Sequence, residues 1–107
     1  TTMKTYIYCT MQIHDPETYL KYTALTPKTL NDYGGKFLTR GDVTDVLEGA
    51  PFEDRMVLLE FPSRTAAEAW YNCKEYQDAS LFRRAASKGR MVIQEGRSDT
   101  SSPDPKV

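Results

Sequence analysis

The sequence predicts an α+β domain, in which one antiparallel sheet carries helices on one face. Apolar residues alternate or run continuously in four short segments, and apolar residues at helical spacing occupy the longer segments between them. Glycine or proline stands at most of the boundaries. The resulting order, βαββαβ, is that of the ferredoxin-like split unit. With 107 residues the chain is one domain, which we place at 3–96 with a polar C-terminal tail at 97–107.

The first strand is expected over residues 3–13, because its side chains alternate in character. Apolar residues face one side and aromatic or polar residues face the other: Ile7, Cys9, Met11 and Ile13 against Tyr6, Tyr8, Thr10 and Gln12. Two tyrosines side by side are a large apolar area for a solvent-facing surface. This second side therefore either packs on another subunit or forms the wall of a cavity.

The first helix is expected to begin after Asp15, which is a good N-cap. Pro16 then takes the first helical position, where its missing N–H costs nothing. Pro27 interrupts the helical spacing and is expected to kink or break the helix near Ala24. The glycines at 34–35 supply a left-handed stop.

Two strands are expected in the middle of the chain. The first covers residues 36–40 and is expected to continue or bend through 43–48. The second, RMVLLEF at 55–61, is a short continuous apolar run, which is typical of a central strand.

The last third of the sequence predicts a divided helix and a final strand. Ser63 is the expected N-cap, and Ala66, Ala69 and Trp70 are expected on the buried side. After a break at 72–73, residues 74–89 form a further helical segment that Gly89 is expected to end. Its inward side is expected to carry Tyr76, Ala79, Phe82 and Arg83. The strand at 90–96 follows.

Composition and charge exclude several classes of function. Lys and Arg number 14 against 15 Asp and Glu, and no single-sign block of five occurs, which argues against a nucleic-acid surface or a membrane-attracted face. No apolar stretch approaches the ~18 residues of a membrane span. Two cysteines in unrelated contexts favour a reducing, cytoplasmic setting. Without a phosphate loop, nucleophile elbow or metal-ligand cluster, we expect no metal or cofactor and neither hydride nor phosphoryl transfer.

Six spaced segments resemble the family called domain of unknown function 1330 (DUF1330), over about residues 4–96: DPETYLKY, YGGKFLTRG, VLEG, RMVLLEFPS, AEAWYNCKEYQ and LFRRAA. The resemblance implies a dimeric α+β barrel, a homodimer whose two sheets pack together with the helices outside. It implies no agreed activity. Relatives of the same architecture include cofactor-independent monooxygenases, polyketide cyclases, lactone isomerases and haem-degrading enzymes, which is an analogy of fold alone.

One residue departs from the family pattern. Where the family usually has serine before the xEYQ segment, which is KEYQ here, this chain has Cys73. A thiol is a poorer helix cap than a hydroxyl, so the substitution weakens the cap. Alternatively, the thiol gains reactivity from its place near a helix N-terminus.

Charged residues within apolar runs are the strongest functional signal. Arg40 and Glu60 lie on strands that would be neighbours, Arg55 opens one of them, and Arg83 lies on the inner edge of the last helix. A buried guanidinium requires a carboxylate or an anionic ligand. Arg40 therefore either pairs with Glu60 or Glu48, or binds the carboxylate or phenolate of a small molecule.

His14 and Trp70 each have two interpretations. His14, the only histidine, is either a general base or a half-exposed residue at a strand end. Trp70 either stacks on an aromatic ligand or belongs to the core.

Two hypotheses of function remain open. The first is a small cofactor-independent enzyme, of isomerase, cyclase or monooxygenase type, acting on a compact aromatic or carboxylated metabolite. Arg40 or Arg83 would hold an anion, and Tyr22, Tyr76 or His14 would move a proton. The second is a non-catalytic dimeric small-molecule-binding or stress-related module. A titratable group with a perturbed pKa in a closed cavity favours the first, and a filled core with every charge paired favours the second.

Overall fold

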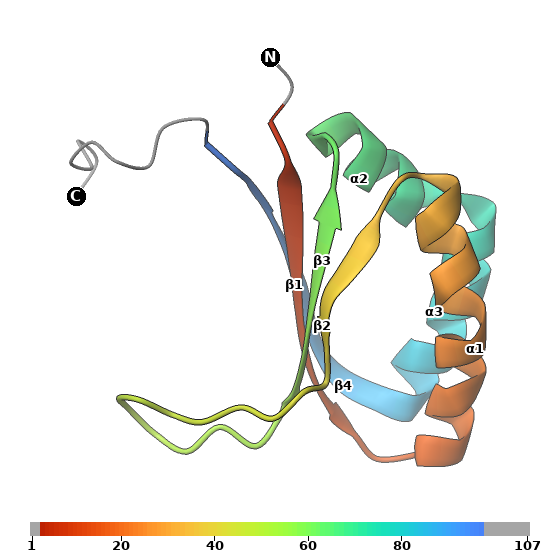
Figure 1. The fold of residues 1–107 in the computed structure, drawn as a ribbon. Coiled ribbons are helices and arrows are strands. Elements are labelled where there is room, and N and C mark those ends of the chain that lie inside the picture. The colour runs from red at the N-terminus through yellow and green to blue at the C-terminus, as the bar shows by residue number, and fades with distance from the viewer. Residues whose placement is uncertain (1–2, 98–107) are drawn as a thin grey trace.

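Seven elements follow the predicted order, with the second helix divided in two (Figure 1). The structure is a computed structural model and describes residues 3–97. The predicted tail therefore lies outside the described residues, except for Arg97. The elements are β1 (Thr5–Ile13), α1 (Pro16–Asp32), β2 (Lys36–Arg40), β3 (Arg55–Phe61), α2 (Arg64–Asn72), α3 (Lys74–Ala86) and β4 (Ser87–Glu95). The sheet has the order β2-β3-β1-β4 with all neighbours antiparallel, which confirms the ferredoxin-like fold and the central position of β3.

The alternation in β1 separates the two faces of the sheet as predicted. Ile7, Cys9 and Met11 are buried beneath the helices. Cys9 lies opposite Val57 of β3 and Met91 of β4, so the same face continues across three strands. All three helices cover this face (Figure 1).

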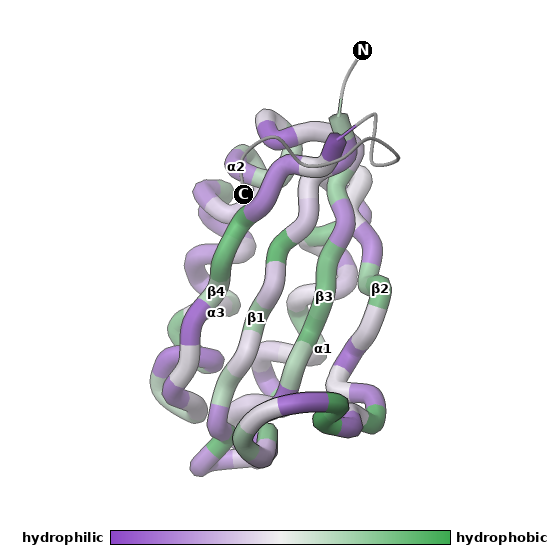
Figure 2. Tube along the Cα trace, turned by 90° about the vertical axis from the view of Figure 1, so that its left-hand side faces the viewer, coloured by the Kyte–Doolittle hydropathy of each residue, from purple (hydrophilic) through white to green (hydrophobic). Residues whose placement is uncertain are grey.

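The other face of the four-stranded sheet is not covered by helices, and Figure 2 shows the strands in front of the helices. Tyr8 lies at its centre, between Leu58 of β3 and Val92 of β4 in the register. Tyr8 is 38% exposed and Val92 is 48% exposed. This surface, defined by Tyr8, Leu58 and Val92, is called the open sheet face below.

Aromatic residues fill the core between the helices and the sheet. The ring of Trp70 lies 5.2 Å from that of Phe61 and 4.0 Å from that of Tyr76, and all three side chains are fully buried. The indole N–H of Trp70 donates to Thr29 Oγ1 at 3.1 Å, so its one polar atom is satisfied. Ala67 occupies the buried side of α2, whereas Ala69, predicted to be buried, is exposed.

Proline does not end α1, so of the predicted kink or break near Ala24 the break is wrong. Pro27 lies inside a helix that runs without interruption to Asp32. Tyr19, Tyr22 and Leu30 bury one side of this helix, and that tertiary packing outweighs the loss of one backbone hydrogen bond. The predicted ends are confirmed, since Asp15 caps the first turn through Thr18 N, and Gly34 adopts a φ of +75° after the last turn.

Two strand boundaries also differ from the prediction. Residues 41–54 form a loop instead of extending the second strand, and they run out on the side of the sheet away from the helices (Figure 1). Gly89 lies within β4 and does not end α3, which stops at Ala86. A Cβ at Gly89 would fall 2.5 Å from Met11 Cα, so glycine permits a close approach of two backbones there.

The helix caps after β3 are as predicted. Ser63 Oγ accepts from Ala66 N at 3.1 Å at the start of α2. Cys73 Sγ accepts from Tyr76 N at 3.4 Å at the start of α3, so the thiol does serve as a cap. Within residues 3–97, none of the helices has the length and apolar character needed to cross a membrane.

Candidate functional site

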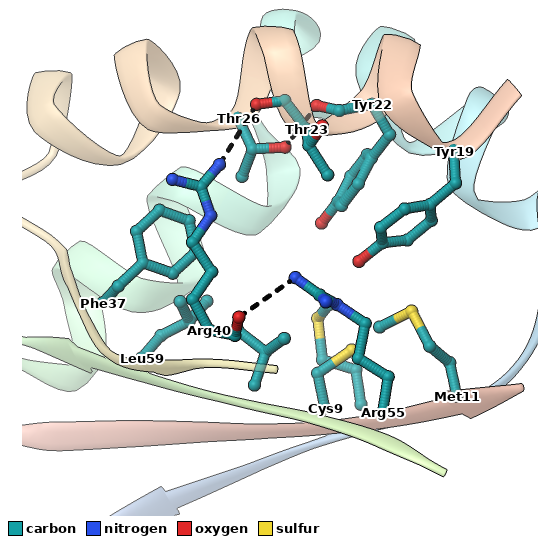
Figure 3. Close-up of a pocket in the computed structure, with 12 residues that line it drawn as sticks. Cys9, Met11, Tyr19, Tyr22, Thr23, Thr26, Phe37, Arg40, Arg55 and Leu59 are labelled. Atoms are coloured by element: carbon teal, nitrogen blue, oxygen red, sulfur yellow. Dashed lines mark hydrogen bonds between the residues drawn. The ribbon is translucent and has the colours of Figure 1, made fainter. Parts of the chain in front are cut away.

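A narrow cavity of about 20 Å³ lies between α1 and the helix-covered face of the sheet (Figure 3). It is bordered by an open hollow of about 500 Å³ at the beginning of α1. Tyr19, Thr23, Arg40 and Arg55 line both spaces and form the boundary between them. The inner space accommodates about one water molecule, so a larger ligand must place most of its body in the outer hollow.

Arg55 is the charged residue at the centre of this boundary. It begins β3, and its guanidinium points toward Tyr19 and Tyr22 (Figure 3). Its Nη2 donates to the backbone carbonyl of Arg40 at 3.3 Å, but its Nε is buried and has no acceptor among residues 3–97.

Arg55 also has no counter-ion in the part of the chain that the structure describes. Glu53 and Asp54 precede it and line a separate hollow with it, yet neither forms an ion pair with it. A buried N–H on a cation is costly to leave without an acceptor. The arrangement is therefore suited to an anionic group on a small molecule.

Arg40 lies at the rim and is held by other contacts. Its Nη2 donates to the carbonyl of Thr23 at 3.3 Å, and its guanidinium lies 4.3 Å above the ring of Phe37. Neither predicted ion pair is present, because no carboxylate in residues 3–97 pairs with it. Glu60 instead pairs with Lys4 at 3.5 Å and Lys36 at 3.4 Å.

Tyr22 and Tyr76 form a buried phenol pair beside the cavity. Their hydroxyl oxygens are 3.1 Å apart, and Tyr22 lines the cavity directly. Burial, reinforced by the neighbouring phenol, raises the pKa of Tyr22 far above 10.0, and burial also raises the pKa of Tyr76. Both side chains are neutral at pH 7, so they are unsuited to acting as general bases. Tyr76 Oη donates to Met91 Sδ at 3.9 Å, which leaves Tyr22 as the donor of the bond to Tyr76.

Arg83 lies behind this pair on α3. Only 8% of its surface is exposed, its Nε has no acceptor among the described residues, and its guanidinium lies 5.9 Å from the ring centre of Tyr22. Burial acts to lower the pKa of Arg83, but the phenols of Tyr76 and Tyr22 outweigh burial and raise it. A second buried positive charge therefore backs the phenol pair.

Cys9 lies on the floor of the cavity and is a poor nucleophile. Burial raises the pKa of its thiol, although Arg83 and Arg55 both act to lower it. The thiol is protonated at pH 7 and contributes a small apolar surface.

The other predicted site residues lie elsewhere. His14 is exposed at the end of β1, outside the cavity lining, and its backbone N–H donates to Ala86 O. Glu60 belongs to the outward-facing set of β3, and Trp70 is in the aromatic core next to Tyr76. The structure thus brings Tyr22 and Arg40 together at the cavity, places Tyr76 and Arg83 behind it, and separates His14 and Glu60 from it.

Arg55 and Tyr19 were not among the predicted site residues. Alternation along β3 gives the signal for Arg55, because residues 55, 57, 59 and 61 share one face and the last three are apolar and buried. Because Arg55 shares this face with the three buried residues, its side chain points into the protein. Within residues 3–97, no group of three or more His, Cys, Asp or Glu side chains converges to hold a metal ion.

Comparisons of this chain with family models and with solved structures identify its family and support its fold. Residues 4–97 match the model described as domain of unknown function (DUF1330). No curated protein matches the chain. RPA0582 from Rhodopseudomonas palustris, a protein of unknown function, has a similar crystal structure: the TM-score is 0.75 at 18% identity, covering 92% of this chain and 86% of that one.

Two further solved structures share the fold at lower similarity. SnoaB, a cofactor-independent oxygenase from Streptomyces nogalater, has a TM-score of 0.60 at 12% identity over 94% of this chain and 100% of that one. A proposed antibiotic biosynthesis monooxygenase from Nitrosomonas europaea has a TM-score of 0.51 at 16% identity over 94% and 98%. At these identities the similarity establishes the fold alone.

Proposed function

The chain belongs to the DUF1330 family, whose description assigns no activity, and we propose from its own residues that it is a small cofactor-independent enzyme. Its substrate is a compact carboxylated or aromatic metabolite whose anionic group binds Arg55. The observation that carries this proposal is the buried Nε of Arg55, which has no acceptor among the described residues and borders a cavity. The body of the substrate occupies the adjoining hollow.

The chemistry supported best is stabilisation of an oxyanion or enolate. Tyr22 places a neutral hydroxyl at the cavity, which donates to the anion once it exchanges its bond to Tyr76, and Arg55 at the cavity and Arg83 beside the Tyr22 ring supply positive charge. Preorganised donors aimed at a developing negative charge are a large source of rate enhancement. Isomerisation, cyclisation and oxygenation can each start from such an anion, and a substrate that enters already ionised as a phenolate or enolate needs no protein base to form it. SnoaB, described as a cofactor-independent oxygenase, has the same fold.

The experiment for binding compares an acid with its neutral analogue. We expect benzoate to raise the thermal unfolding midpoint, because a ligand at ten times its Kd stabilises the native state by about 1.4 kcal/mol. Benzamide, which lacks the charge, gives a smaller shift. Arg55→Met abolishes the benzoate shift, whereas Arg84→Met retains it, since Arg84 is exposed on α3 and contacts Tyr71 away from the cavity. A benzoate shift that survives in Arg55→Met would remove the proposed anion site.

The second experiment separates an enzyme from a binding module. Acids that shift the midpoint are incubated with the protein, with and without oxygen, and followed by NMR for conversion. Tyr22→Phe is expected to slow conversion while leaving the affinity for the acid within about threefold. Binding without conversion of any acid would favour the non-catalytic module over the enzyme.

We also propose that the protein is a homodimer assembled through the open sheet face. Support comes from the exposed apolar residues at its centre and from the 41–54 loop on the same side, where Leu47 is 96% exposed. A stable interface needs roughly 800 Å² per partner, and a four-stranded sheet face with an adjoining loop offers a surface of that order.

A further inference from the structure

Gly41 lies directly against the guanidinium of Arg55. It follows β2 with a φ of +75°, and the position that a Cβ would occupy there falls 2.6 Å from Arg55 Cζ and still closer to Nη1. The Gly41 N–H donates to Met56 O at 3.0 Å, which ties this backbone to β3 next to Arg55. Any side chain at position 41 would have to share space with the guanidinium.

The backbone of residues 40–41 also sets how the guanidinium is oriented. Arg40 O accepts from Arg55 Nη2, and Nη1 lies where a side chain at position 41 would begin. Among the guanidinium nitrogens, Nε is the one that is buried without an acceptor among the described residues. The ring of Tyr19, 5.5 Å from the guanidinium carbon, borders the other side.

We propose that Gly41 is a positioning residue of the anion site. It holds the Arg55 guanidinium so that the Nε–H of Arg55 donates to one carboxylate of a monoanionic acid with a small apolar body. The inference rests on the proposed function for its ligand. A single carboxylate follows because the other cation at the boundary, Arg40, is already bonded to Thr23 O and stacked on Phe37. The apolar body follows from the outer hollow, which is lined by Ile13, Pro16 and Leu20 besides the boundary residues.

A simpler role for Gly41 is to permit positive φ in a turn, and the chain offers a control for it. Gly49 has a φ of +108° and no atom within 4 Å of the position of a Cβ. Gly49→Ala therefore introduces the same kind of backbone strain without any collision. Gly41→Asn is the second variant at the site, because asparagine tolerates positive φ and still carries a Cβ.

The first readout is independent of any ligand. In ¹H–¹⁵N spectra of arginine side chains, the wild type is expected to show slowly exchanging Nε–H signals from Arg55 and Arg83. The signal that disappears in Arg55→Lys is assigned to Arg55. Gly41→Ala and Gly41→Asn are expected to shift the Arg55 signal by more than its linewidth or to expose it to exchange, with the Arg83 signal retained. Gly49→Ala leaves both unchanged. An unchanged Arg55 signal in a folded Gly41→Asn protein would overturn the positioning role.

The second readout is the affinity for benzoate. We expect a loss of tenfold or more in Gly41→Asn and a change of less than twofold in Gly49→Ala. Cyclohexanecarboxylate binds similarly, whereas phthalate, with two adjacent carboxylates, binds at least tenfold more weakly. Tighter binding of phthalate would overturn the monoanion class. If no acid binds the wild type, the proposed function fails, and the spectra still decide whether Gly41 positions Arg55.

Discussion

The Arg40 guanidinium donates a hydrogen bond to the carbonyl of Thr23, the helical carbonyl that Pro27 leaves without an N–H partner. Proline at one position removes the bond to the carbonyl four residues earlier. The last residue of β2 thus compensates for a defect in α1. This contact gives the arginine at the end of β2 a structural partner, and it joins the two elements that border the cavity.

The pairing of Arg40 with this carbonyl can be measured as a double-mutant cycle. Arg40→Ala is expected to lower the free energy of unfolding in urea by about 0.5–1.5 kcal/mol. In the Pro27→Ala background the same change is expected to cost less, because the backbone N–H that alanine restores at position 27 then satisfies Thr23 O. The cycle cancels the effect of proline on the unfolded chain. Equal costs in the two backgrounds would show that Arg40 stabilises the protein through other contacts.

The buried phenols predict a loss of stability at high pH. Unfolded tyrosine ionises near 10.0, whereas the raised pKa of Tyr22 and of Tyr76 keeps them neutral in the native state. Above pH 10 the unfolded state binds fewer protons than the native state, so the free energy of unfolding falls, by up to about 1.4 kcal/mol per pH unit for each group. Below pH 10 this contribution is fully present.

Urea unfolding at pH 8, 10 and 11 measures this slope, and Tyr22→Phe is expected to make it shallower. Absorbance of tyrosinate provides an independent check on the folded protein. If all seven tyrosines ionised together near pH 10, the native phenol pair would not have the raised pKa values on which this expectation depends.

Replacing the thiol cap of α3 is expected to stabilise the protein. Cys73 Sγ accepts from Tyr76 N at 3.4 Å, and a serine hydroxyl in its place is a stronger acceptor. Cys73→Ser is expected to raise the free energy of unfolding by about 0.5–1 kcal/mol, measured in urea. Ser63→Ala, which removes the hydroxyl cap of α2, is the reference for the value of a cap and is expected to lower it. A less stable Cys73→Ser protein would mean that the packing of the sulfur against the core outweighs the cap.

The proposed dimer predicts a specific change of mass in solution. Val92→Glu places a charge at the centre of the open sheet face, beside Tyr8 in the register. Light scattering is expected to give twice 12.2 kDa for the wild type and 12.2 kDa for the variant. Leu81→Glu, on the exposed side of α3, is the matched control and keeps the wild-type mass. A wild type of 12.2 kDa would exclude the dimer.

Local patterns were sufficient to predict most of the fold. Period-two alternation located β1, and a short continuous apolar run located β3. Asp15 and Ser63 marked the beginnings of two helices by a mechanism that involves only neighbouring residues. Pro27 and Gly89 were misjudged because both are helix breakers in isolation. Packing of α1 on the core and the pairing of Gly89 with Met11 overrode that local tendency.

The candidate site was harder to predict, because its contacts join distant segments. Alternation in β3 is enough to assign Arg55 to the buried face. The prediction of an anion-binding residue nevertheless rested first on Arg40, because Arg40 is a charge inside an apolar run. Whether Arg40 meets a carboxylate or a helix carbonyl depends on how β2 lies against α1, which no local pattern records. The phenol pair likewise joins residues 22 and 76 across two helices.

The loop at 41–54 is longer than its two ends require, because β2 and β3 are hydrogen-bonded neighbours. Its middle contributes no strand or helix, and lengthening a flexible loop costs little, about 0.6 kcal/mol for each doubling. A single protease cut between residues 43 and 50 would therefore leave two fragments held together by the sheet and by the packing of α1 on α3. The connection is a place where sequence can be inserted, lost or exchanged while the cavity beside it stays intact, provided that the cut or insertion spares Gly41.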